Sequence, residues 1–251
     1  MGARVRSAAG ALAVVAVLSL GGAGSAAADR LTRTVPLPAS RALTVAITVG
    51  TLEVRGWERA DAEFTITRHA PDAAGVERMP VRIEETDALV RCDLTQEGDT
   101  SPHHRTDLRL RVPRRARLSD VRIVEGRLRV EDFDGAITAD LRRGPIDAAR
   151  VSGALRFETG IGDVDVTEAR LLPSSLLRLR AFNGDVRLHL AGLPTDARLM
   201  ALALNGTITS DIPLAMKDAW GPRWGEATLG RGEPVVSIDV VTGDIEIRVT
   251  R

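Results

Sequence analysis

The sequence predicts an all-β protein built as a single-stranded β-helix, also called a β-solenoid, with coils of about 18–22 residues. Two observations carry this prediction. Glycine recurs every nine residues from position 126 to position 162, and each of these glycines is followed by apolar or small residues two and four places later. Side chains two apart share one face of a strand, and glycine permits the positive φ of a tight turn. Turns therefore alternate with strands, and repetition at this period is typical of solenoids.

The turn glycines extend beyond this central stretch. Every second glycine of the series also has apolar or small residues three and five places before it, so the repeating unit is two strands long. The same template returns after short insertions towards the C-terminus and once near the N-terminus. The predicted turn glycines are Gly50, Gly126, Gly135, Gly144, Gly153, Gly162, Gly184, Gly206 and Gly243. We expect the coils to stack into one elongated domain; the pattern leaves the hand open, and a right-handed coil is expected.

The repeat resembles that of a known family. Units such as FNGDVRLHL at 182–190 and VTGDIEIRV at 241–249 place alternating apolar residues after a Gly-Asp pair. In this they are similar to the bacterial putative adhesin family, exported β-strand-repeat proteins of unknown function (domain of unknown function family 4097). The resemblance runs from residue 43 onwards. It implies a β-helical fold and a location in the cell envelope, and it brings no catalytic residues and no cofactor.

The first 28 residues have the layout of a secretory signal peptide. Arg4 and Arg6 precede the apolar run ALAVVAVLSL, and three alanines at 26–28 close the segment. We therefore expect cleavage after Ala28 and an exported protein in the periplasm, at the cell surface or outside the cell. An uncleaved anchor is the competing interpretation, because the apolar stretch approaches the length of a membrane span. No later segment is long and apolar enough to cross a bilayer.

The remaining chain divides by its regularity. Residues 29–42 are expected to form an extended lead-in, and residues 43–251 the solenoid. Within it, 43–118 is the less regular part, and 119–251 holds the regular coils with an insertion at 213–234. Alternation predicts strands at 43–54, 62–67, 81–84, 88–94 and 108–112, with loops at 69–79 and 96–106. Cys92, the only cysteine, falls on an apolar face, so we expect a buried thiol and no internal disulfide.

Composition limits the classes of ligand. The chain has 34 basic and 34 acidic residues, and loss of a leader with two arginines would change the formal balance from zero to −2. Such a chain has no net field to attract nucleic acid. Aromatic residues make up 3% of the chain and tyrosine is absent. The core must therefore consist of Val, Ile, Leu and Ala, and few aromatic platforms are present for binding carbohydrate.

Two polar segments could bind a ligand. His103 and His104 are adjacent, so on an extended chain they point to opposite faces, and a solvent loop is favoured over a metal site. Arg109 and Arg111 alternate with apolar residues, and three more arginines follow at 114–117. This arginine run could bind phosphate or an anionic glycan. The favoured interpretation is that these arginines lie on the solvent side of a strand.

Stacking the coils in sequence order brings acidic side chains together. The candidate metal ligands are Asp147, Asp163, Asp165 and Asp185. Carboxylates held this closely favour a cation such as calcium. We favour a different explanation, that aspartate follows the turn glycine because turns prefer it. An acidic face with arginines is also where pectate-lyase-like β-helix enzymes act, so a polysaccharide lyase or hydrolase is a third interpretation.

An apolar patch is expected on the outside of the last coils. The position two places before each turn glycine should face outward, yet it is apolar in the last three coils. With its neighbour Leu202, the patch comprises Phe182, Leu204 and Val241. A patch of this kind has to be covered. We favour a lid formed by the insertion 213–234, which carries Trp220 and Trp224; docking of a partner or a second copy is the alternative.

The sequence contains no catalytic or cofactor-binding motif. There is no G-x-S-x-G elbow, no phosphate loop and no H-E-x-x-H. The preferred hypothesis is therefore an exported, non-catalytic binding or scaffold protein of the adhesin type. Its partner would be an envelope glycan or another envelope protein. The alternatives are an envelope-stress sensor or accessory protein, and the polysaccharide-active enzyme.

Overall fold

The computed structural model describes residues 27–96, 103–173, 175–217 and 221–250. In these residues the fold is all-β, with nineteen strands and one helix of six residues. The predicted all-β class is therefore confirmed. The predicted leader lies outside the described residues except for its last two positions, and no helix of the described part is long and apolar enough to cross a membrane.

The elements follow one another with short connections. The N-terminal elements are β1 (Ala27–Pro36), β2 (Ala42–Trp57), β3 (Asp61–Ala70), α1 (Ala73–Arg78), β4 (Arg82–Glu85), β5 (Leu89–Leu94) and β6 (Arg105–Pro113). The central strands are β7 (Arg117–Phe133), β8 (Ala136–Arg143), β9 (Ile146–Val151), β10 (Ala154–Ile161), β11 (Val164–Ala169), β12 (Leu176–Asn183) and β13 (Val186–Leu190). The last strands are β14 (Ala197–Asn205), β15 (Ile208–Ser210), β16 (Ala215–Lys217), β17 (Arg223–Leu229), β18 (Val235–Thr242) and β19 (Ile245–Val249).

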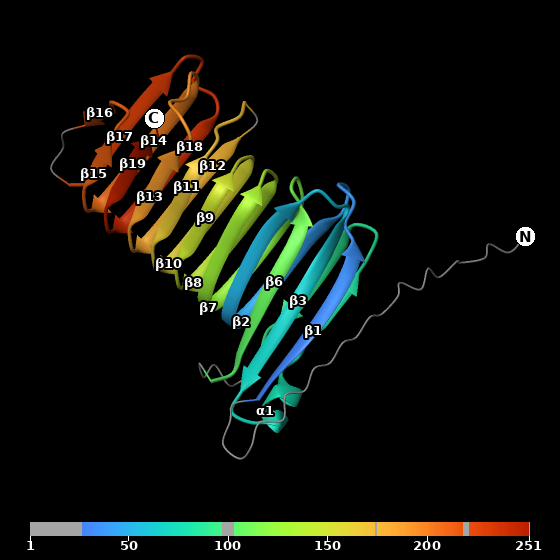
Figure 1. Ribbon diagram of the computed structural model, residues 1–251. Helices are drawn as coiled ribbons and strands as arrows, with labels where there is room; N and C mark the ends of the chain where they lie inside the picture. The colour runs from blue at the N-terminus through green and yellow to red at the C-terminus, as the bar shows by residue number, and fades with distance from the viewer. Residues whose placement is uncertain (1–26, 97–102, 174, 218–220, 251) are drawn as a thin grey trace, which may run out of the picture.

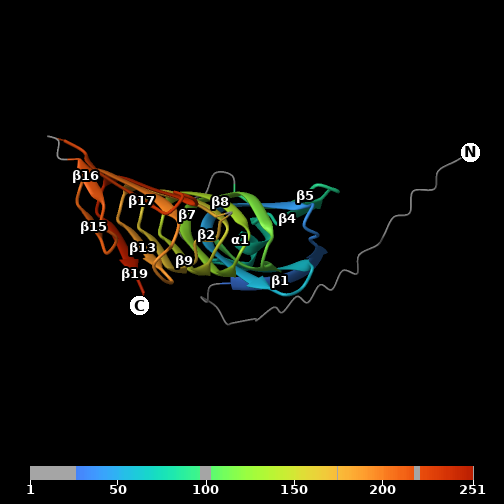
Figure 2. The same cartoon turned by 90° about the horizontal axis from the view of Figure 1, so that it is seen from above.

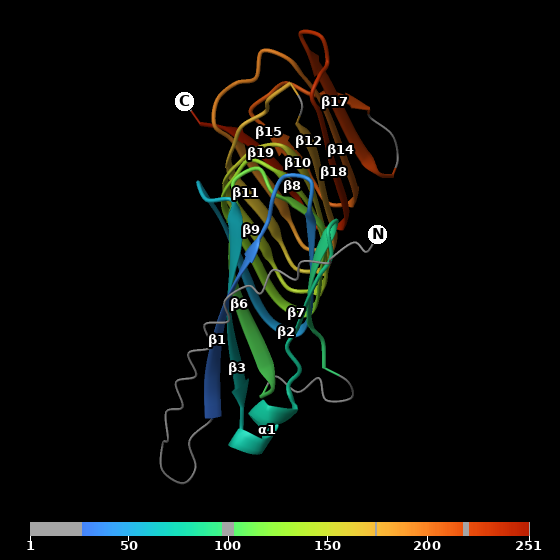
Figure 3. The same ribbon diagram turned by 90° about the vertical axis from the view of Figure 1, so that its right-hand side faces the viewer.

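The strands form two ladders, which share the long strands β2 and β7 (Figures 1 and 3). The β8 ladder runs in the order β4-β5-β2-β7-β8-β10-β12-β18-β14-β17-β16. The β9 ladder runs β1-β3-β6-β2-β7-β9-β11-β13-β19-β15. Because β2 and β7 belong to both ladders, all strands join one mixed sheet. It is parallel in its middle and antiparallel at the β1, β4 and β16 ends, whereas β15 at the fourth end pairs in parallel. That sheet does not close, since β1, β4, β15 and β16 each pair with a single strand in the described part.

The parallel part aligns like positions of successive repeats. In the β8 ladder, Ile137 pairs with Leu155 eighteen positions later, and Leu155 pairs with Leu177 twenty-two positions later. The β9 ladder takes the same step of eighteen from Ile146 to Val164. Equal steps place like positions of successive repeats side by side. Consequently, the side chains of each repeat position form a column that crosses the strands.

The order of the last strands differs from the sequence order. Stacking by sequence places the Gly206 repeat before the Gly243 repeat. Instead, β18 pairs with both β12 and β14, and β19 pairs with both β13 and β15. The insertion explains the exchange, because β17 runs antiparallel to β14 on its far edge and returns the chain so that β18 enters on the near edge.

The core lies between the two ladders, which face each other in the view of Figure 2. Its largest side chains include Phe64, Phe133 and Phe157, all without solvent exposure, set among valines, leucines and isoleucines. Cys92 is buried in this core, as predicted, and burial raises the pKa of its thiol to about 12. A thiol with that pKa stays protonated at neutral pH and acts as a small apolar side chain.

The turn glycines form a column that allows the coils to stack closely. A Cβ atom on Gly126 would lie 1.7 Å from the carbonyl oxygen of Gly50, and one on Gly144 would lie 1.6 Å from that of Gly126. Both glycines have positive φ, as do Gly162 and Gly184 further along. The repeated glycine therefore serves a close backbone approach as well as a turn.

Gly135 departs from the expected turn geometry. It does not have a positive φ, unlike Gly126 and Gly144. A Cβ there would instead lie 2.1 Å from the carbonyl oxygen of Ala116. Glycine is required at this corner because of space and not because of φ, which the nine-residue spacing cannot distinguish.

The N-terminal part contains a short helix where a loop was expected. α1 begins after Asp72, whose Oδ1 accepts a hydrogen bond from the Gly75 backbone N–H at 2.6 Å. An aspartate at this position is a strong helix start. The segment before it, β1, pairs along its whole length with β3, from Ala27 opposite Ala70 to Pro36 opposite Asp61.

Candidate anion-binding groove

The acidic residues singled out from the sequence surround an arginine. Arg187 reaches Asp163 Oδ2 at 3.1 Å, Asp165 Oδ1 at 3.3 Å and Asp185 Oδ2 at 2.7 Å. Burial alone would lower the pKa of Arg187, but its hydrogen bonds to Asp163 and Asp165 raise it. Asp147 is the register neighbour of Asp165 on the adjacent strand, but it pairs with Arg127 at 3.1 Å instead of Arg187. A guanidinium thus occupies the position considered for a metal, and the described residues hold no group of three or more His, Cys, Asp or Glu suited to a metal ion.

The aspartates after the turn glycines also close the turns of neighbouring coils. Asp163 Oδ1 accepts from the backbone N–H of Asp185, and Asp185 Oδ1 accepts from that of Asp244, both at 2.9 Å. Asp244 Oδ1 accepts from the backbone N–H of Thr207 at 2.7 Å. These bonds form a chain along the edge of the β9 ladder. They are the turn chemistry that the sequence favoured, extended from one coil to the next.

The apolar patch stays open in the described part of the chain. Phe182 and Leu204 are 39% and 41% exposed, and Leu202 and Val241 are half-buried. Trp224 lies opposite Leu202 on the adjacent strand β17. The described part of the insertion extends the β8 ladder sideways through β17 and β16, and the lid stays a prediction. Trp220 lies outside the described residues.

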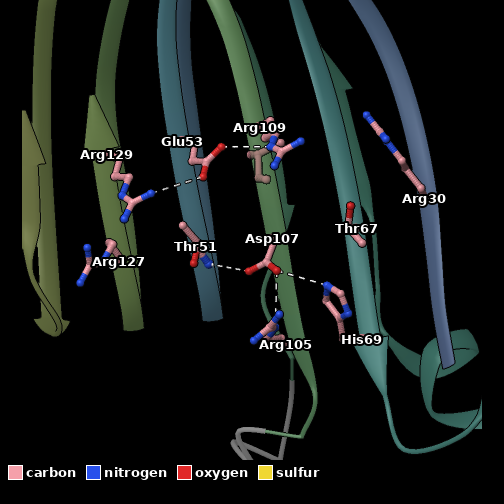
Figure 4. Close-up of a pocket in the computed structure, with 11 residues that line it drawn as sticks. Arg30, Thr51, Glu53, Thr67, His69, Arg105, Asp107, Arg109, Arg127 and Arg129 are labelled. Atoms are coloured by element: carbon pink, nitrogen blue, oxygen red, sulfur yellow. Dashed lines mark hydrogen bonds and ion pairs between the residues drawn. The ribbon is translucent and has the colours of Figure 1, made fainter. Parts of the chain in front are cut away.

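A groove lies on the outer face of the β9 ladder. It has a volume of about 470 Å³ and crosses β1, β3, β6, β2 and β7 (Figure 4). Its lining residues are Arg30, Thr51, Glu53, Thr67, His69, Arg105, Asp107, Leu108, Arg109, Arg127 and Arg129. Five arginines and two carboxylates line the groove, and Asp147 beside it pairs with Arg127, which leaves an excess of two arginines over carboxylates. On a chain with a formal charge of zero, this is a concentrated basic site.

The two carboxylates hold the arginines in position. Glu53 Oε2 accepts from Arg109 Nε at 3.0 Å, and Glu53 Oε1 lies 4.0 Å from Arg129 Nη1. Asp107 Oδ2 lies 3.4 Å from Arg105 Nε. Because Arg105 and Arg109 use their inner nitrogen, the terminal amino groups at the tip of each guanidinium remain directed at the groove or at solvent. That paired edge is the part of arginine that binds carboxylate, sulfate or phosphate.

Asp107 also ties the groove to the backbone. Its Oδ1 accepts from the Thr51 backbone N–H at 3.0 Å, and its Oδ2 lies 3.2 Å from His69 Nε2. These contacts join β2, β6 and β3 at one point (Figure 4). The carboxylate is therefore held from three strands, which fixes the floor of the groove.

Strand alternation and register bring these residues together. On β6, Arg105, Asp107 and Arg109 point outward because Thr106 and Leu108 between them are buried. One row across the strands reads Arg127, Thr51, Asp107, Thr67 and Arg30, and a second reads Arg129, Glu53 and Arg109. Sequence analysis identified Arg109 within the arginine run and missed Arg30, Thr67, His69 and Arg105. Alternation on 27–36 and 61–70 was the available signal, but the antiparallel pairing of β1 and β3 could not be predicted from it.

Comparisons with known proteins add a likeness of fold. No protein-family model and no curated protein matches the chain. Similar solved structures include a putative cell adhesion protein from Clostridium sporogenes, 13% identical, which covers 88% of this chain and 100% of that chain with a TM-score of 0.43. A putative adhesin from Bacteroides fragilis is 10% identical, covers 87% of this chain and 96% of that chain, and has a TM-score of 0.46.

A further similar structure is a putative lipid binding protein from Parabacteroides distasonis. It is 10% identical, covers 88% of this chain and 97% of that chain, and has a TM-score of 0.25. These identities are too low to assign a function. The resemblance to domain of unknown function family 4097 therefore stays a prediction.

Proposed function

We propose that the protein is an exported, non-catalytic binding protein of the adhesin type that takes an anionic ligand in the basic groove. The observation that carries this proposal is the arrangement of five arginines around two carboxylates that hold two of them by the inner nitrogen. Such an arrangement orders the arginines through ion pairs and keeps an excess of positive charge among the lining residues. It favours binding over acid-base chemistry, because both carboxylates are engaged with arginines.

We also propose that the parallel strands form the predicted β-solenoid, wound as a right-handed coil through both ladders. The alignment of like repeat positions, 18 or 22 residues apart, and the column of turn glycines support this assignment. A stack of this kind makes a broad, rigid outer face. Rigidity suits a binding surface, because little conformational freedom is lost when the ligand docks.

Export remains part of the proposal. Cleavage of the leader near Ala28 would leave β1 from Asp29 onwards, with its pairing to β3 intact. Envelope glycans and envelope proteins are the partners that such a location offers. The exposed patch around Phe182 and Leu204 favours a second candidate, a scaffold or sensor that docks a protein on the β8 ladder.

The first test is equilibrium binding of anions to the purified full-length chain. Polygalacturonate, a carboxylated polymer, should bind, and affinity should fall as salt rises, since exposed charges are screened. The double substitution Arg109→Ala and Arg129→Ala should weaken binding at least about tenfold, as expected for two lost charge-assisted contacts.

The matched control removes the same charge elsewhere. Arg156→Ala with Arg178→Ala acts on the outer face of the β8 ladder, where these arginines are neighbours in register. This control should bind like the parent chain. Failure to bind polygalacturonate, inorganic phosphate or sulfated polymers, or equal losses in both double variants, would contradict the proposed function.

A further inference from the structure

We infer that the ligand of the groove is a linear acidic polysaccharide that lies across the strands from β1 to β7. This inference rests on the proposed function and adds the class of ligand and its direction. Three features of the groove argue for it: the span of its arginines, the orientation of their guanidinium groups, and the chemistry of its lining.

The span of the groove requires an extended ligand. Arg30 on β1 and Arg127 on β7 end one row of side chains that crosses five strands. Four strand spacings correspond to about 19 Å. A single phosphate, sulfate or carboxylate can reach arginines on neighbouring strands only. A chain bearing several anionic groups can contact β1, β6 and β7 together.

The guanidinium groups are prepared for such a ligand. Arg109 and Arg105 are each held through Nε by a carboxylate of the groove. Within the described residues, the Arg30 guanidinium has no hydrogen bond or ion pair, and Figure 4 draws it at the far end of the groove. Arg30 is therefore the cation that a short ligand would leave unused and a long ligand would engage.

The lining favours a polysaccharide over other polyanions. The hydroxyls of Thr51 and Thr67 can exchange hydrogen bonds with sugar hydroxyls. No Phe, Tyr or Trp side chain lines the groove, so it lacks the large aromatic platforms on which single-stranded nucleic acid bases stack. Leu108, its one apolar lining residue, is fully buried, so no apolar side chain from the groove can insert into a membrane.

A length series tests the inference. Galacturonate and its oligomers of two, four, six and eight residues would be titrated into the full-length chain at fixed low salt. Affinity should rise at least about tenfold from the single sugar to the longest oligomers and then level off once the groove is filled. Oligomers with esterified carboxylates should bind far more weakly, since esterification removes the charge.

Arg30→Ala provides the sharpest variant. It should weaken binding of the eight-residue oligomer by about two- to tenfold, the effect of one exposed charge contact, and leave binding of galacturonate unchanged. Arg178→Ala on the opposite ladder is the control and should change neither. Circular dichroism of each variant confirms that the sheet is intact.

The outcomes separate this inference from the proposed function. Equal affinity for the monomer and the octamer, or no effect of Arg30→Ala, would overturn the extended polysaccharide while leaving an anion-binding site. Tighter binding of single-stranded DNA or of anionic phospholipid vesicles than of any oligogalacturonate would also overturn it. Absence of binding to every anion would instead remove the proposed function itself.

Discussion

Single residues in this protein carry tasks that their side-chain chemistry alone does not reveal. A glycine with positive φ is typical of a turn. In the central column it also leaves space for the backbone carbonyl of the neighbouring coil. The aspartate after that glycine is expected to be a solvent-exposed charge. Its carboxylate also accepts a hydrogen bond from the backbone N–H of the corresponding aspartate in the adjacent coil. Both tasks exist only between coils, so they are properties of the stack.

Gly144→Ala separates the two roles of glycine. Gly144 has φ of 133°, and an added Cβ would lie 1.6 Å from the carbonyl oxygen of Gly126. We expect a loss of about 3 kcal/mol or more in the free energy of unfolding, measured by urea denaturation. Gly192→Ala is the control, because Gly192 has φ of 154° but an added Cβ would meet nothing within 4 Å. Equal losses in both variants would show that φ alone matters.

The loss of stability at low pH tests the hydrogen bonds that Asp244 accepts from Thr207. The pKa of Asp244 is lowered by the hydrogen bonds that its carboxylate accepts from the backbone N–H and the side-chain hydroxyl of Thr207. A lowered folded-state pKa means that the stabilisation is present above the unfolded pKa, about 3.9, and is lost as pH falls through the folded value. Asp244→Asn should therefore lose less stability than the parent between about pH 5 and pH 2. Identical pH profiles of the melting temperature would refute this role.

At the scale of elements, strand order is the feature that the repeat does not encode. The strands β14 and β18 carry the same alternation and the same turn glycine, so either could follow β12. The insertion decides which of the two strands follows β12, because its strand β17 pairs with the outer edge of β14. Likewise, the groove depends on β1 and β3, whose antiparallel pairing extends the β9 ladder beyond the repeats.

Engineered cysteines can test this order. Asn183 pairs with Thr242, and Thr242 pairs with Asn205, at three exposed positions of one column. Asn183→Cys with Thr242→Cys should form a disulfide under mild oxidation, because neighbouring strands lie about 4.8 Å apart. Asn183→Cys with Asn205→Cys should not, since these strands are two spacings apart. Mass spectrometry without reductant shows which of the two variants forms a disulfide. A disulfide only in the variant with Asn183→Cys and Asn205→Cys would show that β14, and not β18, lies next to β12.

At the scale of the whole molecule, the two outer faces differ in character. The β9 ladder carries the basic groove at its N-terminal end and a chain of Asp–Arg contacts further along. The β8 ladder carries the apolar patch around Phe182 and Leu204 near its C-terminal end. Two separate surfaces on one rigid stack allow a ligand and a protein partner to bind without competing. This arrangement fits the proposed binding role better than a single catalytic cleft.

Local sequence patterns were sufficient to predict the all-β class, the turn glycines, the buried Cys92 and the outward face of the arginine run. These follow from local alternation and spacing, which a strand imposes on its own residues. Tertiary structure alone decided which strands are neighbours. It inserted β18 between β12 and β14, placed Arg187 among Asp163, Asp165 and Asp185, and joined Arg30 to Arg127 across five strands. An alternation with a period of two residues specifies which face of a strand each side chain occupies. Which strand pairs with each edge depends instead on loops and insertions, which the alternation does not describe.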